Sequence, residues 1–407
     1  MGNGIARRDF LLGLGAAGLS PMLAATGCGA PEDPSRYTEE DKARLAAQRE
    51  RELTSAGRGP FGYQHYRGYA GLAELPWFEV DSDGVLRCVA ADVNAIDMHC
   101  HLGMSVLFAP ELDLHRRSER VQHLLDCDGE EPGCDLDLDI YINGNFSAAH
   151  QKRLRRETIS QGFFGSAAAA THTIPNLLAE MDAMRVEQCA VLPIVFGFPF
   201  GDDLSERWRR AIAKAEVEHR LLCGASVHPR DSRKIEHLEA QAAAGARIVK
   251  LHPTMQRFYP DEQGAMEIYE ACERLGLIVF WHGGRAGIEP EATQRYALPR
   301  HYEGALSGFP NVDFVIGHGG ARDFDEMLEI GLRYENAWFD THGQGVTKLY
   351  QLLRRSGGER MVFGTDWPFY HVAASLAKVL LITEQTPDLR DAVLRENALK
   401  LLARAAA

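Results

Sequence analysis

Positive charge is scarce in this 407-residue sequence: 44 lysine and arginine residues stand against 57 aspartate and glutamate residues, for a net charge of −13 at pH 7. Nucleic-acid binding requires clustered positive charge, so this balance argues against a nucleic-acid partner. Low-complexity segments are also missing, and 45% of the residues are hydrophobic, as in ordinary globular proteins. A chain of this length can therefore bury a large core without disulfides or metal ions to stabilise it.

The eight cysteines include no CxxC pair, which removes the usual signature of a zinc ribbon or a thioredoxin-like motif. Cys127 and Cys134 flank a short acidic loop with glycine and proline, the kind of loop that a disulfide closes in an oxidising compartment. The other internal cysteines lie in apolar runs and are interpreted as small buried hydrophobic residues. They are Cys88, Cys100, Cys189, Cys223 and Cys272.

Residues 1–28 are typical of an export signal and are excluded from reasoning about the fold. A twin arginine precedes an apolar run that extends to Ala25, as in twin-arginine signals. This run is shorter than the roughly 20 residues that cross a bilayer as a helix. It ends at Cys28 in a pattern that resembles a bacterial lipoprotein signal, although Ala25 stands where leucine is preferred. Cys28 is expected to carry lipid, with simple cleavage as the alternative, and the protein to be periplasmic or at the cell surface.

The next residues, 29–93, are expected to form an N-terminal arm or tether on the surface. The segment from Thr38 to Asp41 is typical of a capping box and predicts the start of a helix. A hairpin is expected around Asp81–Gly84. Aromatic residues in this region are expected to pack against the main domain.

From residue 94 onward, short runs rich in β-branched residues alternate with stretches of helical period, as in repeated βα units. The expected strands are residues 94–101, 188–194, 221–228, 246–252, 277–282, 312–318, 337–342 and 361–366, and the expected helices are 174–185, 204–218, 233–244, 261–275, 323–334 and 346–356. This alternation over 94–407 predicts an α/β fold of the (β/α)8 TIM-barrel class, with a doubly wound open sheet as the competing arrangement. Residues 104–173 interrupt it and are expected to form an insertion that caps the barrel mouth.

The first expected strand carries the pattern His99-Cys100-His101. Alternate side chains of a regular strand share a face, which predicts Asp97, His99 and His101 on one face and apolar residues on the other. Two imidazoles about 7 Å apart along a strand can bind one divalent ion, and a pair of surface histidines is the alternative. Asp97 is either a partner for a ligand imidazole or a residue that only shapes the strand.

Other expected strands also end in histidine or aspartate. These residues are His228, His252, His282, His318, His342 and Asp366. Buried imidazoles and carboxylates are costly unless they are paired or metal-bound, and the strand ends of a barrel meet at one mouth. The distribution therefore favours a metal site.

Four segments together resemble the amidohydrolase superfamily, and more closely its amidohydrolase-related branch, which includes aminocarboxymuconate-semialdehyde decarboxylase. They are residues 96–101 (IDMHCH), 279–282 (VFWH), 316–320 (IGHGG) and 364–369 (GTDWPF). Residues 178–182 and an expected last helix at 395–402 add to the similarity. The resemblance covers residues 94–103 and 174–404, and it implies a barrel enzyme that depends on a metal.

The resemblance implies a mononuclear site with His99, His101 and His282 as nitrogen ligands and Asp366 as the carboxylate. The ion would be Zn²⁺, with Mn²⁺ or Fe²⁺ as alternatives. His318 would act as general base or acid near the metal-bound water, with Asp366 as the second catalytic residue. A bound metal lowers the pKa of water from about 16 to about 7, where an imidazole can pass on the proton.

Further residues at the expected strand ends are candidates for substrate binding. Lys250 would be a substrate-binding cation, or else a lysine paired with a carboxylate or bridging two metals as in binuclear relatives. Arg285 would meet a substrate carboxylate with its planar guanidinium, unless it forms a surface salt bridge. His252 and His342 would contact substrate, or they are hydrogen-bonded core residues.

Taken together, these residues predict a metal-dependent hydrolase that attacks an amide, ester or lactone carbonyl of a small molecule. Metal-dependent, non-oxidative decarboxylation of a small carboxylate is the first alternative. A non-enzymatic binding lipoprotein on a barrel scaffold is the second. The expected partners are a small-molecule substrate, a membrane reached through a lipidated Cys28, and a second copy of the chain in a homodimer.

Overall fold

The computed structural model of the protein describes residues 35–128 and 134–405. The chain divides into two compact units, Met1–Arg36 and Tyr37–Ala407, and the second unit holds every helix and strand that the structure describes. The export signal and the lipidation site expected within residues 1–28 lie outside the described residues. No helix in the described part of the chain is both long enough and apolar enough to cross a membrane.

Parallel strands alternate with helices along most of the second unit, as the sequence predicts. Within the described residues, eight of these strands form two sheets ordered β4-β6-β7 and β8-β9-β10-β11-β12. Their bounds are β4 Ala95–Cys100, β6 Val186–Val191, β7 Leu221–Cys223, β8 Ile248–Leu251, β9 Ile278–Trp281, β10 Phe314–Ile316, β11 Ala337–Asp340 and β12 Met361–Val362. Parallel bridges join Ala225 to Val249 and Cys100 to Trp367, and so close the two sheets on each other. The fold is therefore a TIM barrel and not an open doubly wound sheet.

Apolar side chains from successive strands fill the interior of the barrel. The interior cluster comprises Ile96, Met98, Ala190, Leu192, Ile248, Ile278, Phe280, Val315, Trp338 and Val362, together with Ala398 and Leu401 of helix α15 (Asn397–Arg404). Each of these residues is at most 2% exposed. The barrel is thus a packed core and not a pore, and α15 contributes to that core from outside the strands.

Helices connect the barrel strands and cover them. They are α4 Ile174–Ala183, α5 Leu204–Lys214, α6 Lys234–Ala243, α7 Pro253–Gln256, α8 Gln263–Leu275, α9 Glu291–Gln294, α10 Glu303–Gly308, α11 Phe324–Leu332, α12 Val346–Ser356, α13 Val372–Thr383 and α14 Pro387–Asp391. The six helices that the sequence predicts between the strands are among them, and the predicted last helix corresponds to α15. Gly276 ends α8 with a φ of 63°, a left-handed conformation that glycine adopts without strain.

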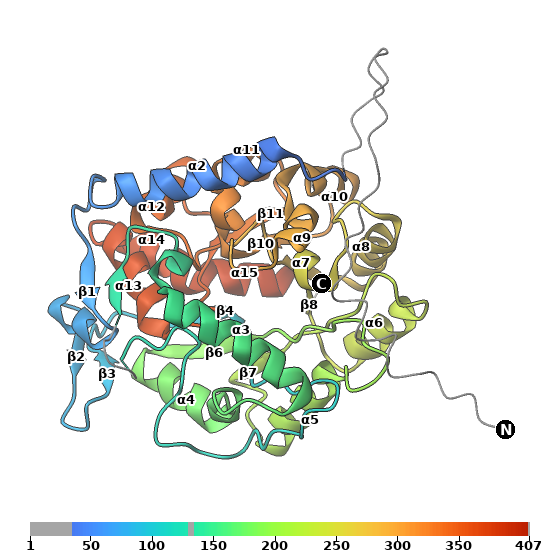
Figure 1. Ribbon diagram of the computed structural model, residues 1–407, viewed down its shortest axis with the longest axis horizontal. Coiled ribbons are helices and arrows are strands. Elements are labelled where there is room, and N and C mark those ends of the chain that lie inside the picture. Colours follow the sequence, from blue (N-terminus) through green and yellow to red (C-terminus); the bar gives the residue numbers. More distant parts are fainter. Residues whose placement is uncertain (1–34, 129–133, 406–407) are drawn as a thin grey trace, which may run out of the picture. The chain divides into compact units, whose positions relative to one another are not determined.

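The N-terminal arm and the insertion pair with each other. Helix α2 (Glu39–Ser55) begins at the predicted capping box and lies beside α11 (Figure 1). The arm also contains the predicted hairpin, formed by β2 (Phe78–Val80) and β3 (Leu86–Cys88). Strand β1 (His65–Arg67) pairs antiparallel with β5 (Asp135–Asp137) of the insertion, which continues into helix α3 (Ala148–Phe163).

The insertion also contacts the loop that follows β11. The Ile142 N–H donates to the Gly343 carbonyl at 2.8 Å. Tyr141 lies so close to Gly343 that a Cβ added there would come within 2.8 Å of its ring. These contacts bring the insertion to the carboxyl end of the barrel, where functional groups of this fold are found.

Candidate metal centre

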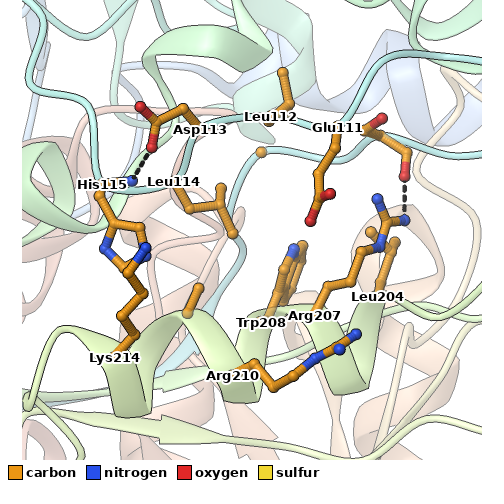
Figure 2. Close-up of a pocket in the computed structure, with 13 residues that line it drawn as sticks. Glu111, Leu112, Asp113, Leu114, His115, Leu204, Arg207, Trp208, Arg210 and Lys214 are labelled. Atoms are coloured by element: carbon orange, nitrogen blue, oxygen red, sulfur yellow. Dashed lines mark hydrogen bonds between the residues drawn. The ribbon is translucent and has the colours of Figure 1, made fainter.

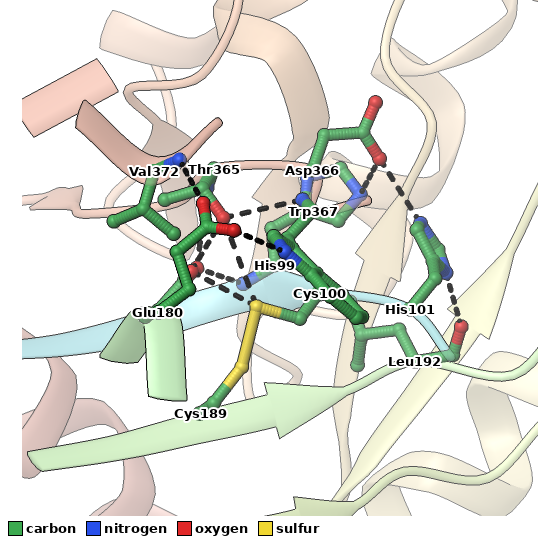
Figure 3. Close-up of a disulfide and its surroundings, with 11 residues drawn as sticks. His99, Cys100, His101, Glu180, Cys189, Leu192, Thr365, Asp366, Trp367 and Val372 are labelled. Carbon is green, nitrogen blue, oxygen red and sulfur yellow. Dashed lines mark hydrogen bonds and ion pairs between the residues drawn. A yellow bond between two sulfur atoms is a disulfide. The ribbon is translucent and has the colours of Figure 1, made fainter. Parts of the chain in front are cut away.

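Histidine and aspartate side chains from separate strands meet at the carboxyl end of the barrel. His99 lies in β4 and His101 follows it, while Asp366 follows β12. One nitrogen from each of these histidines and an oxygen of Asp366 lie within 4.8 Å of one another, and Figure 3 shows the three side chains converging. His318 and His342 form another such group with the same Asp366. All five side chains are buried.

A β-bulge in β4 decides which of its side chains enter the barrel. Asp97 of β4 is paired with Cys189 of β6, whereas Cys100 is paired with Val191. Between these two pairs, β4 therefore advances by three residues and β6 by two. The extra residue reverses the side to which the following side chains point.

The bulge contradicts the facing that strict alternation predicts for this strand. Ile96 and Met98 belong to the barrel interior, and His99 packs there too, while Asp97 points to the other side. The Asp97 carboxylate bonds neighbouring segments: Oδ1 accepts the His99 backbone N–H at 2.9 Å, and Oδ2 accepts the Thr365 hydroxyl at 2.5 Å. Asp97 therefore shapes the backbone and does not contact a ligand ring.

Hydrogen bonds orient the imidazoles of both His99 and His101. His99 Nδ1 lies 2.7 Å from Asp340 Oδ2, and His101 Nδ1 lies 2.6 Å from the Leu192 carbonyl oxygen. Because these oxygens accept, each ring carries a proton on Nδ1 and directs an Nε2 lone pair elsewhere. The two Nε2 atoms lie 3.5 and 3.1 Å from Asp366 Oδ1. Electron pairs that face each other in this way fit a bound cation, and two imidazoles with a carboxylate suit a divalent ion such as Zn²⁺.

Asp340 is the acceptor that joins three strand ends. Its Oδ2 accepts from His99 and from the backbone N–H of His318 at 3.0 Å, and its Oδ1 accepts the backbone N–H of His342 at 2.9 Å. Burial raises the pKa of Asp340 to about 7, against the lowering effect of those backbone N–H groups. A Cβ at Gly364 would collide with Oδ1, so glycine is needed there. The carboxylate that orients a ligand ring thus comes from β11, not from β4 as one reading of the sequence suggests.

His282 lies beside His318, farther from His99 and His101. Its Nδ1 is 2.8 Å from His318 Nε2, and its ring stacks on His252 with centroids 4.0 Å apart. No ligand group found among the described residues includes His282, so its role as the third nitrogen ligand stays a prediction. His318 Nδ1 is buried without a hydrogen-bond partner in the described part of the chain, and a bound ion or substrate would satisfy such an atom.

Burial keeps five imidazoles at this end of the barrel neutral at pH 7. It lowers the pKa of His99, His252 and His318 well below the ordinary value, and that of His282 and His342 to about 3. Burial raises the pKa of Asp366, but His101, His342 and Lys250 outweigh it and hold that pKa below its ordinary value. Neutral imidazoles beside a carboxylate are the protonation states that metal binding requires.

Lys250 and His342 both lie inside the cluster, where the sequence places them. The Lys250 Nζ is 2.8 Å from His99 Nε2, so it contacts the lone pair that a metal ion would use. Burial lowers the pKa of this lysine to about 8. His342 Nε2 lies 3.7 Å from Asp366 Oδ2. Contact of Lys250, His252 and His342 with substrate stays a prediction.

Arg285 occupies a different place from the one expected for a substrate-binding residue. Its Nε donates to Asp323 Oδ2 at 2.8 Å, and an Nη donates to the Asp41 carbonyl at 2.6 Å. A further contact reaches the Tyr37 hydroxyl at 3.4 Å. These bonds commit the guanidinium to anchoring the N-terminal arm, which corrects its assignment to a substrate carboxylate. The alternative expectation of a salt bridge holds, but the pair is buried.

Arg322 is a cation near the barrel mouth that sequence reasoning missed. It is 7% exposed, its guanidinium carbon lies 5.3 Å from the centroid of the Tyr141 ring, and its Nε donates to Glu52 at 3.2 Å. Burial raises the pKa of both Tyr141 and Tyr370, the charge of Asp366 raises it further and that of Arg322 lowers it. The two phenols therefore lie near the cation and the metal-site carboxylate. Nothing in the sequence pattern distinguishes Arg322 from other loop arginines.

Two disulfides are present among the described residues. The predicted bond between Cys127 and Cys134 is formed. A second bond joins Cys100 to Cys189, which corrects the interpretation of these two residues as unbonded hydrophobic side chains. The neighbouring parallel strands β4 and β6 bring the two sulfurs together, and sequence separation hides this proximity.

A separate cavity of about 350 Å³ lies between residues 103–115 and helix α5 (Figure 2). Arg207, Arg210 and Lys214 of α5 line it, together with Glu111 and Asp113. Its lining contains none of the histidines of the metal centre. The cavity is therefore distinct from the cluster.

The closed barrel and the buried cluster of histidines and aspartate at its mouth define a metal-dependent enzyme of the (β/α)8 class. The family described as Amidohydrolase matches residues 96–404. The chain belongs to this family, which confirms the resemblance carried by the strand-end segments. No curated protein matches the chain.

Several solved structures share the fold. An uncharacterised TIM-barrel protein from Bordetella bronchiseptica is 20% identical, with a TM-score of 0.54 over 77% of this chain and 100% of that one. A 2,6-dihydroxybenzoate decarboxylase from Rhizobium is 15% identical, with a TM-score of 0.50 over 75% of this chain and 99% of its own. A 5-carboxyvanillate decarboxylase from Sphingomonas paucimobilis is 15% identical, with a TM-score of 0.50 over 76% and 99%. At these identities the likeness establishes the fold alone.

Proposed function

We propose that this protein is a metal-dependent decarboxylase that releases carbon dioxide from a small aromatic carboxylate. One observation carries the metal dependence: the Nε2 atoms of His99 and His101 lie 3.5 and 3.1 Å from the same oxygen of Asp366. A set of two imidazoles and a carboxylate, with a further histidine close by, suits a single divalent ion. Zn²⁺ is the first choice, with Mn²⁺ or Fe²⁺ as alternatives.

The choice of decarboxylation over hydrolysis reverses the order that the sequence suggests. Two of the solved structures with the same fold are decarboxylases of hydroxylated benzoates by name. In addition, the buried Arg322 lies beside the phenol of Tyr141. Its Nε donates to Glu52 and its Nη1 to the Ala286 carbonyl, so Nη2 is the nitrogen that would donate a charge-assisted hydrogen bond to a substrate carboxylate. An aromatic acid is the substrate class that such a pair of groups recognises.

The residues of the site have separate tasks in this reaction. A bound divalent ion would act as a Lewis acid on substrate oxygens. Arg322 would hold the carboxylate, and Tyr141 and Tyr370 would pack against the ring and exclude water. As the carbon–carbon bond breaks, its electron pair stays on the ring carbon, which takes up one proton. His318, which is neutral in the resting site, would relay that proton from solvent, because its Nδ1 has no protein partner within the described residues.

Hydrolysis of an amide, ester or lactone is the second candidate. The same ligands would serve it, and His318 favours it for a specific reason. A buried imidazole nitrogen that no described protein group occupies suits a general base that takes a proton from water.

In the test, the purified protein is first loaded with Zn²⁺ or Mn²⁺. It is then incubated with 2,6-dihydroxybenzoate, 5-carboxyvanillate and the methyl esters of these acids. We expect release of carbon dioxide from at least one acid, and loss of that activity on chelation and in His101→Ala. Arg322→Gln is expected to raise the KM for the acid about ten-fold or more, since a charged hydrogen bond is worth roughly 1.5–3 kcal/mol. Arg354→Gln, at an exposed arginine of α12, is the matched control and should leave the KM unchanged.

The alternatives predict different results in the same assay. Cleavage of the esters without carbon dioxide release would support the hydrolase instead. Metal-free protein that takes up no divalent ion and turns over neither class would contradict both reactions and favour the binding lipoprotein.

A further inference from the structure

The Cys100–Cys189 disulfide lies directly behind the metal-site residues, and the proposed reaction does not use it. Cys100 is the last residue of β4 and stands between His99 and His101 in the sequence, and Cys189 belongs to the neighbouring strand β6. Both cysteines are completely buried. Figure 3 shows the sulfur–sulfur bond connecting the strand of the two histidines with the next strand.

The bond spans the β-bulge of β4. The residue opposite Cys189 is Asp97, and the residue opposite Cys100 is Val191. The disulfide therefore joins the β4 residue after the bulge to the β6 residue before it. A bulge interrupts the ladder of hydrogen bonds between strands, and here a covalent bond closes that gap. The bulge is also the feature that turns the histidines inward.

Strand β6 orients one ligand ring through the residue that follows it. The Leu192 N–H donates to the Cys100 carbonyl at 2.8 Å, and the Leu192 carbonyl accepts from His101 Nδ1 at 2.6 Å. The register of β4 and β6 thus sets the direction of the His101 lone pair. The disulfide fixes this register three residues earlier on β6.

Asp97 connects the disulfide with the segment of the third ligand. Its Oδ1 accepts the backbone N–H groups of His99 at 2.9 Å and Thr365 at 3.2 Å, and its Oδ2 accepts the Thr365 hydroxyl at 2.5 Å. The same Oδ2 lies 2.9 Å from Cys100 Sγ. A disulfide sulfur carries no hydrogen, whereas a thiol would donate to this oxygen in competition with Thr365. Because Asp366 follows Thr365, a change at the sulfur reaches both segments that carry ligands.

We propose that the Cys100–Cys189 disulfide is a redox-dependent positioning element that sets the metal affinity of the centre. The oxidised bond holds β4 and β6 in the register that aligns His99 and His101 with Asp366. A dithiol reductant supplies two electrons and two protons, breaks the sulfur–sulfur bond to give two thiols, and is itself oxidised to a cyclic disulfide. The reduced protein binds the ion more weakly. This inference rests on the metal centre and not on the reaction catalysed there.

Paired cysteine variants test the proposal. Cys100→Ala/Cys189→Ala removes this disulfide, and Cys127→Ala/Cys134→Ala removes the one in the insertion and serves as the matched control. The affinity for Zn²⁺ is measured by competition with a chromophoric chelator, and thermal unfolding of the metal-free protein checks the fold. We expect the first variant to bind Zn²⁺ about ten-fold more weakly or worse, the range for groups that orient ligands. The Zn²⁺ affinity of the control should stay within about two-fold of that of the unmodified protein.

A second measurement needs no variant to fold. The unmodified protein is incubated with a dithiol until thiol counting shows that the disulfides are open, and Zn²⁺ affinity is then measured. We expect the same loss as in the Cys100→Ala/Cys189→Ala variant, and recovery on reoxidation. The reductant should cause no further loss in that variant.

Equal Zn²⁺ affinities of the oxidised protein, the reduced protein and the Cys100→Ala/Cys189→Ala variant would overturn the proposal. Uptake of an additional equivalent of Zn²⁺ on reduction would also overturn it. In that case Asp97, Cys100 and Cys189, whose ligand atoms lie within 4.8 Å of one another, would form a second metal site. A protein that binds no divalent ion in either redox state would refute the centre itself.

Discussion

At the scale of single residues, the chemistry of the centre depends on where protons sit, and neighbouring groups decide this. His99 and His101 each donate through Nδ1 to an oxygen, which leaves the lone pairs of both Nε2 atoms for the proposed metal ion. The oxygen that faces His99 belongs to Asp340, which also accepts two backbone N–H groups. A carboxylate in this position raises the basicity of the ligand ring and keeps it in one orientation.

Asp340→Asn tests this role. The amide retains the shape of the side chain but weakens the acceptor for His99 Nδ1, so we expect metal affinity to fall by about 10- to 100-fold. Titration with Zn²⁺ measures the change. Asp313→Asn is the control, since Asp313 is also buried but accepts from Trp338 Nε1 at 2.9 Å just before β10. Equal losses in the two variants would show that Asp340 has no specific role in orienting the ligand.

At the scale of elements, Glu180 of α4 connects segments that are far apart in the chain. Its carboxylate accepts from His123 Nε2 in the insertion at 3.1 Å, from Trp367 Nε1 after β12 at 3.0 Å, and from the Val372 N–H at the start of α13 at 2.8 Å. Burial raises the pKa of Glu180, but His371 and His123 outweigh it, and the pKa falls to about 2. The charged form is therefore the one that the fold requires.

Glu180→Gln should destabilise the protein in a pH-dependent way. The pKa of Glu180 falls from its ordinary 4.5 to about 2 on folding, so between these values the unfolded chain binds more protons. The contribution of this carboxylate is complete above pH 4.5 and disappears as the pH falls toward 2. We expect the free energy of unfolding to drop by roughly 3–5 kcal/mol at pH 7, and the difference to shrink in acid.

Denaturant unfolding at a series of pH values checks this expectation. Glu239→Gln is the control, because Glu239 and its partner Arg274 are both exposed and such pairs contribute little. A loss for Glu180→Gln that is the same at neutral and acid pH would argue against a role for the charge.

At the scale of the whole molecule, one end of the barrel carries the candidate site and the other contributes to stability. The metal centre lies at the carboxyl ends of the strands, while α15 packs on the interior core through Ala398 and Leu401. In folds of this class, the end opposite the site serves stability. Changes at α15 should therefore leave the ligands undisturbed.

Leu401→Ala and Leu399→Ala test this separation on a single helix. Leu401 is completely buried and Leu399 is 39% exposed. We expect Leu401→Ala to lower the free energy of unfolding by about 3 kcal/mol through the cavity that it leaves, and Leu399→Ala by less than about 0.5 kcal/mol. Both proteins should bind Zn²⁺ with unchanged affinity. Weaker binding in Leu401→Ala alone would mean that the two ends of the barrel are coupled.

The sequence by itself determined the architecture and the general location of the site. Hydrophobic runs and helical stretches mark the barrel strands and their helices because burial imposes a period on each element. His99, His101 and Asp366 stand at strand ends, which parallel strands bring together at one mouth. The disulfide between Cys127 and Cys134 was also predictable, since a short loop separates the two residues.

Only the tertiary structure decided the contacts that strand pairing and packing create. The bulge in β4 depends on its register against β6, and it moved Asp97 away from the histidines and joined Cys100 to Cys189. Asp340 and Arg322 lie far in sequence from the groups that they contact, His99 and Tyr141, and no local period marks them. A sequence pattern indicates which side chains an element buries. The partner of each buried polar atom, however, belongs to a neighbouring element, so it is determined only when the barrel closes.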